Sequence, residues 1–230
     1  MKRFAVALAL ALGGLVVVYV PTFVLAAFAI KSGAFGSPAA SRGEPVVVPL
    51  IICISAAIAL TLIAALAQYS TLNPVEFGFK APAVRSVTLA LMLGLLFAAG
   101  LRGLSLILPI GNSPDLGDMH RWQIIAYFWL GAPIQEEIIF RGLLQTIFQA
   151  RDPRSALIGS VALPFSVFAC AAIFAAVHVA TVRLGASPAH VAFIVFGAFV
   201  PGVLAGYLRW KSSSLLPAIA VHAVFNMFAS

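Results

Sequence analysis

Long apolar runs separated by short polar stretches extend along the whole chain. Seven such runs fall at about residues 4–30, 46–68, 86–110, 121–150, 156–181, 189–209 and 213–229. A helix needs roughly 20 apolar residues to cross the hydrocarbon core of a bilayer. The pattern therefore predicts an all-α, polytopic membrane bundle of about seven transmembrane helices.

The composition agrees with this fold class and limits the domain count. Apolar residues make up 62% of the 230 residues and charged residues only 9%, against roughly 25% charged in soluble domains. The length suits one compact bundle, so we expect residues 1–230 to form a single transmembrane domain. The first run is much longer than the roughly 7–15 residues of a signal-peptide core, which predicts a retained first helix.

The basic residues flank the apolar runs, which is typical of helix anchors and not of a nucleic-acid interface. With a cytoplasmic N-terminus, eight lie inside: Lys2, Arg3, Lys80, Arg85, Arg151, Arg154, Arg209 and Lys211. Four lie outside: Lys31, Arg42, Arg121 and Arg183. This asymmetry predicts a cytoplasmic N-terminus, and the compact chain suggests a bacterial inner (cytoplasmic) membrane.

A few side chains inside the apolar runs can ionise. They are Arg102, Glu136, Glu137, Arg141, His178 and His222, and Asn226 adds a neutral amide. A charge at the bilayer centre costs about 2.5–3.5 kcal/mol on insertion scales, so such residues are candidates for function. We expect them to face the bundle interior or a water-filled cavity and not lipid.

The stretch "QEEIIFRGLLQ", residues 135–145, places two adjacent carboxylates and a guanidinium in the fourth run. Glu137 and Arg141 are four residues apart, so they share a helix face and can pair. Glu136 is rotated by about 100° from its neighbour, which leaves its carboxylate for another task. Pro133 lacks a backbone donor and is expected to kink the helix or open it to water.

Two further motifs lie in the fifth and seventh runs. "FAAVH" places Phe174 and His178 on one helix face, and "HAVFN" does the same for His222 and Asn226. Each pair alone is typical of hydrogen bonding between helices. Together with Glu136 they supply the groups that activate water beside a carbonyl. From the residues alone, a hydrolytic site, a structural polar cluster and a proton or transport path all stay open.

Small residues mark the sixth run. Its "PGVLAG" stretch holds Gly202 and Gly206 at the Gly-x-x-x-Gly spacing, and Gly197 lies five residues before Gly202. Small residues four apart let helix backbones approach closely in lipid. This spacing predicts tight helix packing on one face of the sixth helix.

In chain order, Glu-Glu-x-x-x-Arg, Phe-x-x-x-His and His-x-x-x-Asn resemble the signature of the CAAX protease and bacteriocin-processing (CPBP, or Abi) family of intramembrane endopeptidases. The resemblance covers about residues 121–230, which would hold the catalytic core. It implies a glutamate-type intramembrane protease that needs no cofactor and cleaves a peptide or membrane-protein substrate within the lipid bilayer. Nothing in the sequence indicates a prenylated substrate.

The resemblance also implies a role for each motif residue. The catalytic set is Glu136, His178, His222 and Asn226, and the supporting set is Glu137, Arg141 and Phe174. The first glutamate would activate water with help from His178. The second histidine and the asparagine would stabilise the oxyanion, the Glu–Arg pair would brace the helix, and the phenylalanine would pack against the site.

Three alternatives compete with this hypothesis. A zinc protease could use Glu136, His178 and His222 as ligands, but the chain has no His-Glu-x-x-His motif. A non-enzymatic immunity or scaffold protein is less consistent with a complete set of motif residues. A proton-coupled transporter predicts internal repeats, and the sequence has no convincing repeat.

Overall fold

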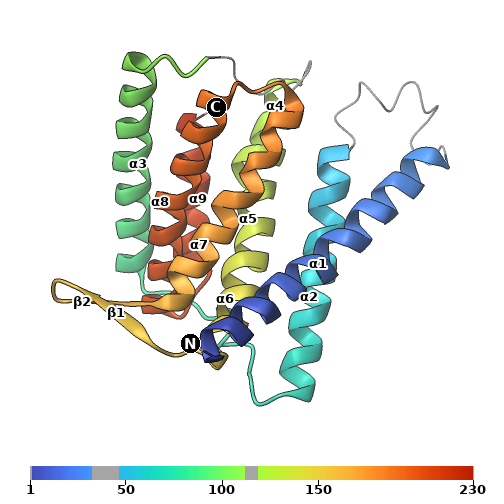
Figure 1. Cartoon of the computed structure of the whole chain (residues 1–230), viewed down its shortest axis with the longest axis vertical. Helices are drawn as coiled ribbons and strands as arrows, with labels where there is room; N and C mark the ends of the chain where they lie inside the picture. Colours follow the sequence, from blue (N-terminus) through green and yellow to red (C-terminus); the bar gives the residue numbers. More distant parts are fainter. Residues whose placement is uncertain (1, 33–46, 112–118, 230) are drawn as a thin grey trace.

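The computed structural model describes residues 2–32, 47–111 and 119–229, and these form seven helical rods packed side by side (Figure 1). The rods are α1 (Lys2–Lys31), α2 (Val47–Tyr69), α3 (Val84–Ile107), a segmented fourth rod, α7 (Phe165–Val177) with the 3₁₀ turn η4 (His178–Leu184), α8 (Pro188–Ser212) and α9 (Leu216–Ala229). Five of the helices are long and apolar enough to cross a bilayer. The predicted all-α membrane bundle is confirmed.

The fourth rod is built from five consecutive helical segments. They are α4 (Arg121–Gln123), the π-helix η2 (Ile124–Gly131), α5 (Ala132–Glu137), the π-helix η3 (Ile138–Leu144) and α6 (Gln145–Arg151). The wide register is visible where Ala132 N–H bonds to Tyr127 O and Gln145 N–H bonds to Phe140 O, each five residues back. Such π segments occur frequently at functional sites. Here they flank the short α5 that carries both glutamates.

The predicted fifth span, 156–181, is wrong in its first third. A two-stranded antiparallel hairpin, β1 (Ser155–Ile158) and β2 (Val161–Pro164), occupies this segment, and α7 begins only at Phe165. Gly159 has φ +60°, as the first position of a two-residue type II′ turn requires. Gly159-Ser160 between two apolar runs was the signal for a hairpin, and the unbroken apolar composition concealed it.

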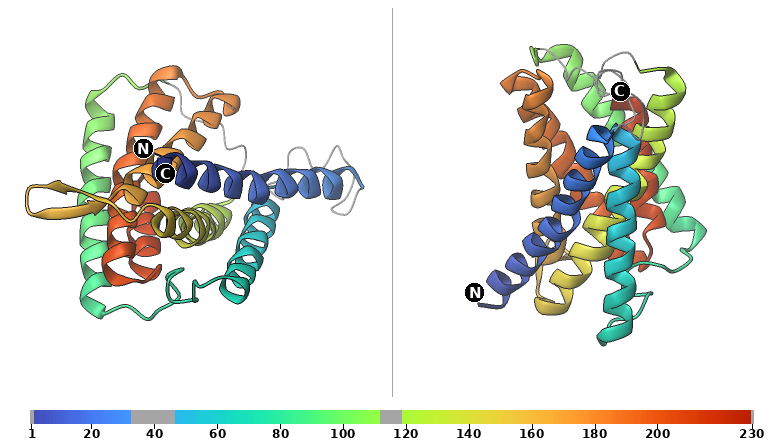
Figure 2. Two further views of the ribbon diagram at one scale, coloured as in Figure 1. Left: turned by 60° about the horizontal axis from the view of Figure 1, so that its bottom comes forward. Right: turned by 90° about the vertical axis from the view of Figure 1, so that its right-hand side faces the viewer.

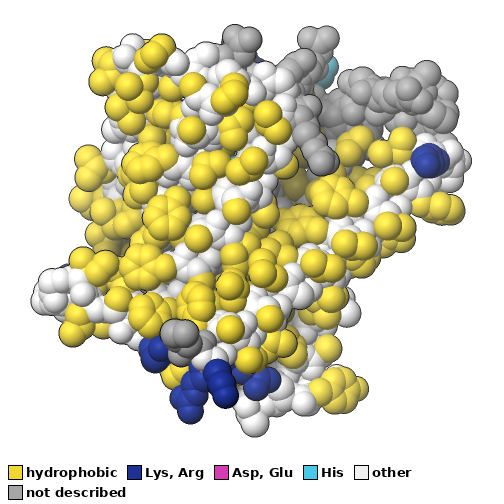
Figure 3. Space-filling view, in the orientation of Figure 1, with side chains coloured by type: hydrophobic (Ala, Val, Ile, Leu, Met, Phe, Trp, Pro, Cys, Tyr) yellow, Lys and Arg dark blue, Asp and Glu magenta, His cyan; other side chains and the backbone are white. Residues whose placement is uncertain are grey.

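The basic residues gather at one end of the bundle. Helices α1, α3, α7 and α9 begin at the lower end of Figure 1, where α2, α6 and α8 end. All eight basic residues expected on one side belong to the ends and loops located there, and Figure 3 shows dark blue side chains at the lower end. Of the other four, Lys31 and Arg121 lie at the opposite end, and Arg42 lies outside the described residues.

The fourth rod is the centre of the molecule. All seven residues of η3 are buried, with α1 and α2 on one side and α7, α8 and α9 on the other (Figure 2). Helix α3 packs against α9 on the outside. Apolar side chains cover most of the surface in Figure 3, as expected for a protein surrounded by lipid.

The contact between α3 and α9 depends on a glycine. A Cβ at Gly94 would lie 3.0 Å from the Val221 carbonyl oxygen and 3.2 Å from Val224 Cβ. We predict that Gly94→Ala lowers the free energy of unfolding by about 1–3 kcal/mol, because the nearest crowded atom, the Val221 carbonyl oxygen, belongs to the backbone and cannot rotate away. Thermal unfolding in detergent measures this change.

Gly100→Ala on the same helix is the matched control, because no atom lies within 4 Å of its Cβ position. It should be neutral or stabilise α3 slightly, since alanine favours helix over glycine. Equal destabilisation by both substitutions would contradict close packing at Gly94.

Candidate active site

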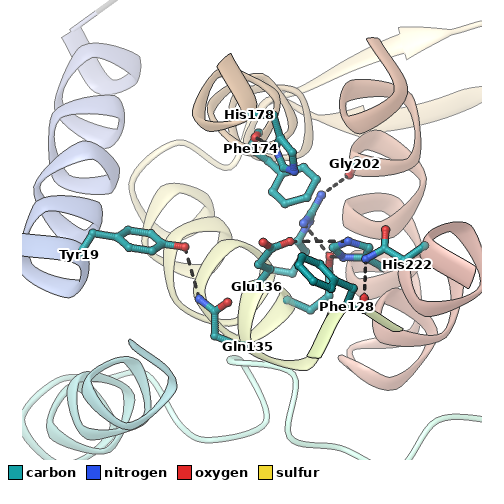
Figure 4. A network of polar contacts seen from close by, with 11 residues as sticks. Tyr19, Phe128, Gln135, Glu136, Phe174, His178, Gly202 and His222 are labelled. Atoms are coloured by element: carbon teal, nitrogen blue, oxygen red, sulfur yellow. Dashed lines mark hydrogen bonds and ion pairs between the residues drawn. The ribbon is translucent and has the colours of Figure 1, made fainter. Parts of the chain in front are cut away.

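The Glu137 carboxylate is the centre of a polar network that joins the fourth rod to α8 and α9. Figure 4 shows the surroundings of this network, with Glu136, Gly202 and His222 labelled. Its Oε1 atom accepts hydrogen bonds from Arg141 Nη1 at 2.7 Å and from His222 Nδ1 at 2.8 Å. Both Glu137 and Arg141 have 0% exposure. The ion pair expected from the four-residue spacing is present, whereas the bond to His222 was not anticipated.

The two glycines of the sixth rod meet donors from the fourth. Arg141 Nη2 donates to the Gly202 carbonyl and Gln145 Nε2 donates to the Gly206 carbonyl, both at 3.0 Å. A Cβ at Gly202 would lie 3.0 Å from Arg141 Nη2. Glycines at this spacing therefore do more than allow close packing, because they leave two carbonyl oxygens within reach of buried donors.

Glu136 faces the same imidazole from the other side. Its side chain is 23% exposed, and its Oε2 atom lies 3.6 Å from His222 Nε2. Because the Glu137 carboxylate can only accept, His222 Nδ1 carries a hydrogen and its Nε2 atom is directed toward Glu136. With both carboxyls ionised, Glu136, Glu137 and Arg141 sum to one negative charge.

Phe174 separates the two histidines. Its ring centroid lies 4.7 Å from that of His178 and 5.5 Å from that of His222, and the Arg141 guanidinium lies over it at 4.6 Å. His178 Nδ1 donates to the Phe174 carbonyl at 2.8 Å, which leaves Nε2 as the free ring nitrogen. Within the described residues, no hydrogen bond or ion pair joins His178 to Glu136.

Asn226 contacts the fourth rod at Phe128, on the N-terminal side of the two glutamates. Its Nδ2 atom donates to the Phe128 carbonyl at 2.9 Å. In the π register of η2 the backbone donor for this carbonyl would be residue 133, which is a proline without an N–H. Asn226 therefore replaces the hydrogen bond that Pro133 removes, and its second amide hydrogen is not used in this contact.

The first helix also reaches this region, which the sequence did not indicate. Gln135 Nε2 donates to the Tyr19 hydroxyl at 3.3 Å, and Gln135 is 4% exposed. Figure 4 shows this pair on the side of the site away from the two histidines. A single tyrosine in an apolar helix carries no local signal of such a contact, although the glutamine beside Glu136 was a polar residue in need of a partner.

The residues proposed as zinc ligands are not arranged as a metal site. Glu136 and His222 face each other, while His178 lies across the Phe174 ring. Among the residues that the structure describes, no three His, Cys, Asp or Glu side chains are close enough to hold one ion. Zinc at Glu136, His178 and His222 would require a rearrangement of this cluster.

The fold and the site together define an integral membrane protein with a cluster of buried ionisable groups at the centre of a helical bundle. Residues 119–228 match the family model described as Type II CAAX prenyl endopeptidase Rce1-like. This match covers just under half of the chain, includes every predicted site residue, and supports the CAAX protease and bacteriocin-processing family that the motifs resemble. Comparisons with curated proteins and with solved structures give no match.

The buried ion pair should dominate stability and the exposed glutamate should not. Arg141→Met leaves Glu137 as an uncompensated buried charge, so we predict a loss of about 3–5 kcal/mol in the free energy of unfolding. Glu136→Gln, the neighbouring substitution at a partly exposed carboxylate, should change it by less than about 1 kcal/mol. Equal losses of unfolding free energy in the two variants would show that burial and pairing do not distinguish Glu137 from Glu136.

The bond between Asn226 and Phe128 can be tested with a double-mutant cycle. Asn226→Leu should cost about 1–3 kcal/mol because it leaves a partly buried carbonyl without a donor. In a Pro133→Ala background the new backbone N–H can replace the lost donor, so the same substitution should cost less than half as much. Strictly additive unfolding free energies would exclude this account of the asparagine.

Proposed function

We propose that this chain is an intramembrane endopeptidase in which Glu136 activates the attacking water. The proposal rests on the different burial and pairing of the two adjacent glutamates. Glu137 is fully buried and bonded to Arg141 and His222. Glu136 keeps a partly exposed carboxylate with no cation closer than His222 Nε2 at 3.6 Å among the described residues. A general base needs such an accessible, weakly paired carboxylate.

In the proposed reaction Glu136 removes a proton from water as the water oxygen attacks the carbonyl carbon of the scissile peptide bond. His178 helps by accepting from the same water through Nε2, the ring nitrogen that its bond to Phe174 leaves free. The tetrahedral intermediate then collapses and the C–N bond breaks. Glu136 returns its proton to the leaving amine, so the protons balance over the cycle.

In the proposed reaction, side chains of α9 stabilise the oxyanion. In this proposal His222 is protonated while Glu136 is ionised. His222 Nε2–H is then a donor. Glu137 stabilises this imidazolium through its 2.8 Å bond to Nδ1. The second amide hydrogen of Asn226 is the other proposed donor, while the first holds the Phe128 carbonyl. Fixed donors in a site shielded from water are effective at stabilising developing charge.

We propose a peptide or membrane-protein substrate presented within the bilayer. The matched family is described as a prenyl endopeptidase, but no feature of this chain points to recognition of a prenyl group. Because the basic end of the bundle carries the N-terminus, we place that end in the cytoplasm. The membrane that we propose is a bacterial inner membrane.

The central prediction concerns a cleavage product in the membrane. Mass spectrometry of membrane proteins from cells with and without this chain should identify a new N-terminus. Glu136→Gln should reduce its formation by about 10²- to 10⁴-fold, the usual contribution of a general base. Glu76→Gln, at an exposed carboxylate in the loop between α2 and α3, is the matched control and should leave cleavage unchanged.

Two results would contradict this mechanism. If Glu136→Gln and His178→Ala both preserve the cleavage product, the chain does not act as the proposed protease. If a strong chelator abolishes cleavage by purified protein and zinc restores it, the metal-free reaction is wrong. We expect activity to persist in the chelator.

A further inference from the structure

The β1–β2 hairpin is an apolar projection that the site does not use. Its ten residues, "SALIGSVALP", include no charged side chain. Leu157 is 77% exposed, Ile158 55% and Val161 42%. In the following, the hairpin tip means residues 157–161.

Both faces of the hairpin tip are apolar. Leu157 is paired with Ala162 and Ile158 with Val161, and consecutive residues of a strand point to opposite faces. A lone two-stranded hairpin is marginal in water, and soluble proteins protect exposed edges with charges or proline. The only proline is at the base, and no charge protects the tip, so the tip is suited to an apolar environment.

The position of the hairpin identifies that environment. Figures 1 and 2 show it projecting sideways past the end of α3, across the direction of the helices. It leaves the bundle at the end where the basic residues gather (Figure 3). A segment that lies across the ends of membrane helices is at the level of the lipid headgroups.

The base of the hairpin is fixed and basic. Arg154 Nε and Nη2 each donate to the Asp152 carboxylate at 2.7 Å, and the guanidinium lies 5.2 Å from the Phe165 ring. These hydrogen bonds hold the pKa of Asp152 below its ordinary value. Phe165 N–H closes the base by donating to the Arg154 carbonyl at 3.0 Å. The neighbouring Arg151 is exposed.

We propose that the hairpin tip inserts into the boundary between headgroups and acyl chains of an anionic phospholipid leaflet. Leu157, Ile158 and Val161 then lie among the upper acyl chains, and Arg151 contacts lipid phosphates. Exposed apolar side chains combined with nearby cations are what binding to an anionic membrane surface requires. Because α7 begins directly at Phe165, this anchor fixes the depth of the helix that carries Phe174.

Spin labels on the full chain in lipid nanodiscs test the proposal. Cys53→Ala removes the exposed cysteine, and Cys170 is only 1% exposed. Single cysteines then replace Leu157 or Ile158. Two reference positions are Leu96 on α3, 72% exposed toward lipid, and the exposed loop residue Ser70. Collision rates with oxygen and with a water-soluble nickel chelate report the depth of each label.

We expect both tip labels to be protected from nickel relative to the label at position 70, and to lie shallower than the label at position 96. Nickel access at the tip equal to that at position 70 would overturn the proposal. Protection that appears only when a synthetic apolar peptide is added would also overturn it, since that result indicates strand addition to the hairpin. Neither measurement depends on proteolytic activity.

The anionic component has its own test. Nanodiscs of phosphatidylcholine are compared with discs in which part of the lipid is phosphatidylglycerol. The label at position 158 should be more protected with phosphatidylglycerol, and Arg151→Gln should remove most of that difference. One basic residue near an anionic surface changes partitioning by about fivefold. Identical protection in both lipids would exclude the proposed contact with acidic headgroups.

Discussion

The bond network around the Glu137 carboxylate is the interaction on which the rest of the site depends. This carboxylate has no exposed surface, and it accepts from Arg141 at 2.7 Å and from His222 at 2.8 Å. Removing two charges from water is expensive, and only a close pair with further hydrogen bonds offsets the desolvation. The Gly202 carbonyl provides one such bond by accepting from the guanidinium. The helices that carry these groups are therefore held in one relative position.

Backbone geometry makes this network possible. The fourth rod widens into π turns on both sides of the glutamates, and glycines on α8 let its backbone approach Arg141 and Gln145. The same widening, together with Pro133, frees the Phe128 carbonyl, which Asn226 then satisfies. In a helix with regular α hydrogen bonding, Ala132 N–H would instead occupy the Phe128 carbonyl. Irregular backbone is tolerated at this depth because neighbouring helices supply the missing donors.

The arrangement assigns different chemistry to two identical residues. Glu137 is enclosed and neutralised, so it orients His222 and stabilises that imidazole when it is protonated. Glu136 is a neighbour in sequence but faces outward from the pair, and its 3.6 Å approach to His222 leaves room for proton exchange. In the proposed mechanism the base and one oxyanion donor face each other across this distance.

The sequence by itself determined the features that follow from the spacing of residues within one helix. Apolar length predicted the bundle, the four-residue spacing predicted the pair of Glu137 and Arg141, and the glycine spacing predicted a crowded face on α8. It could have predicted the hairpin as well, because Gly159-Ser160 between apolar runs is a turn signal.

The tertiary structure alone decided which distant groups meet. His222 contacts Glu137 across 85 residues, and Asn226 contacts Phe128 across 98. Tyr19 reaches Gln135 across 116. No periodicity encodes these contacts, because they depend on how rigid helices cross and rotate after each has formed. Local spacing sets the face on which a side chain lies, and packing sets what that face meets.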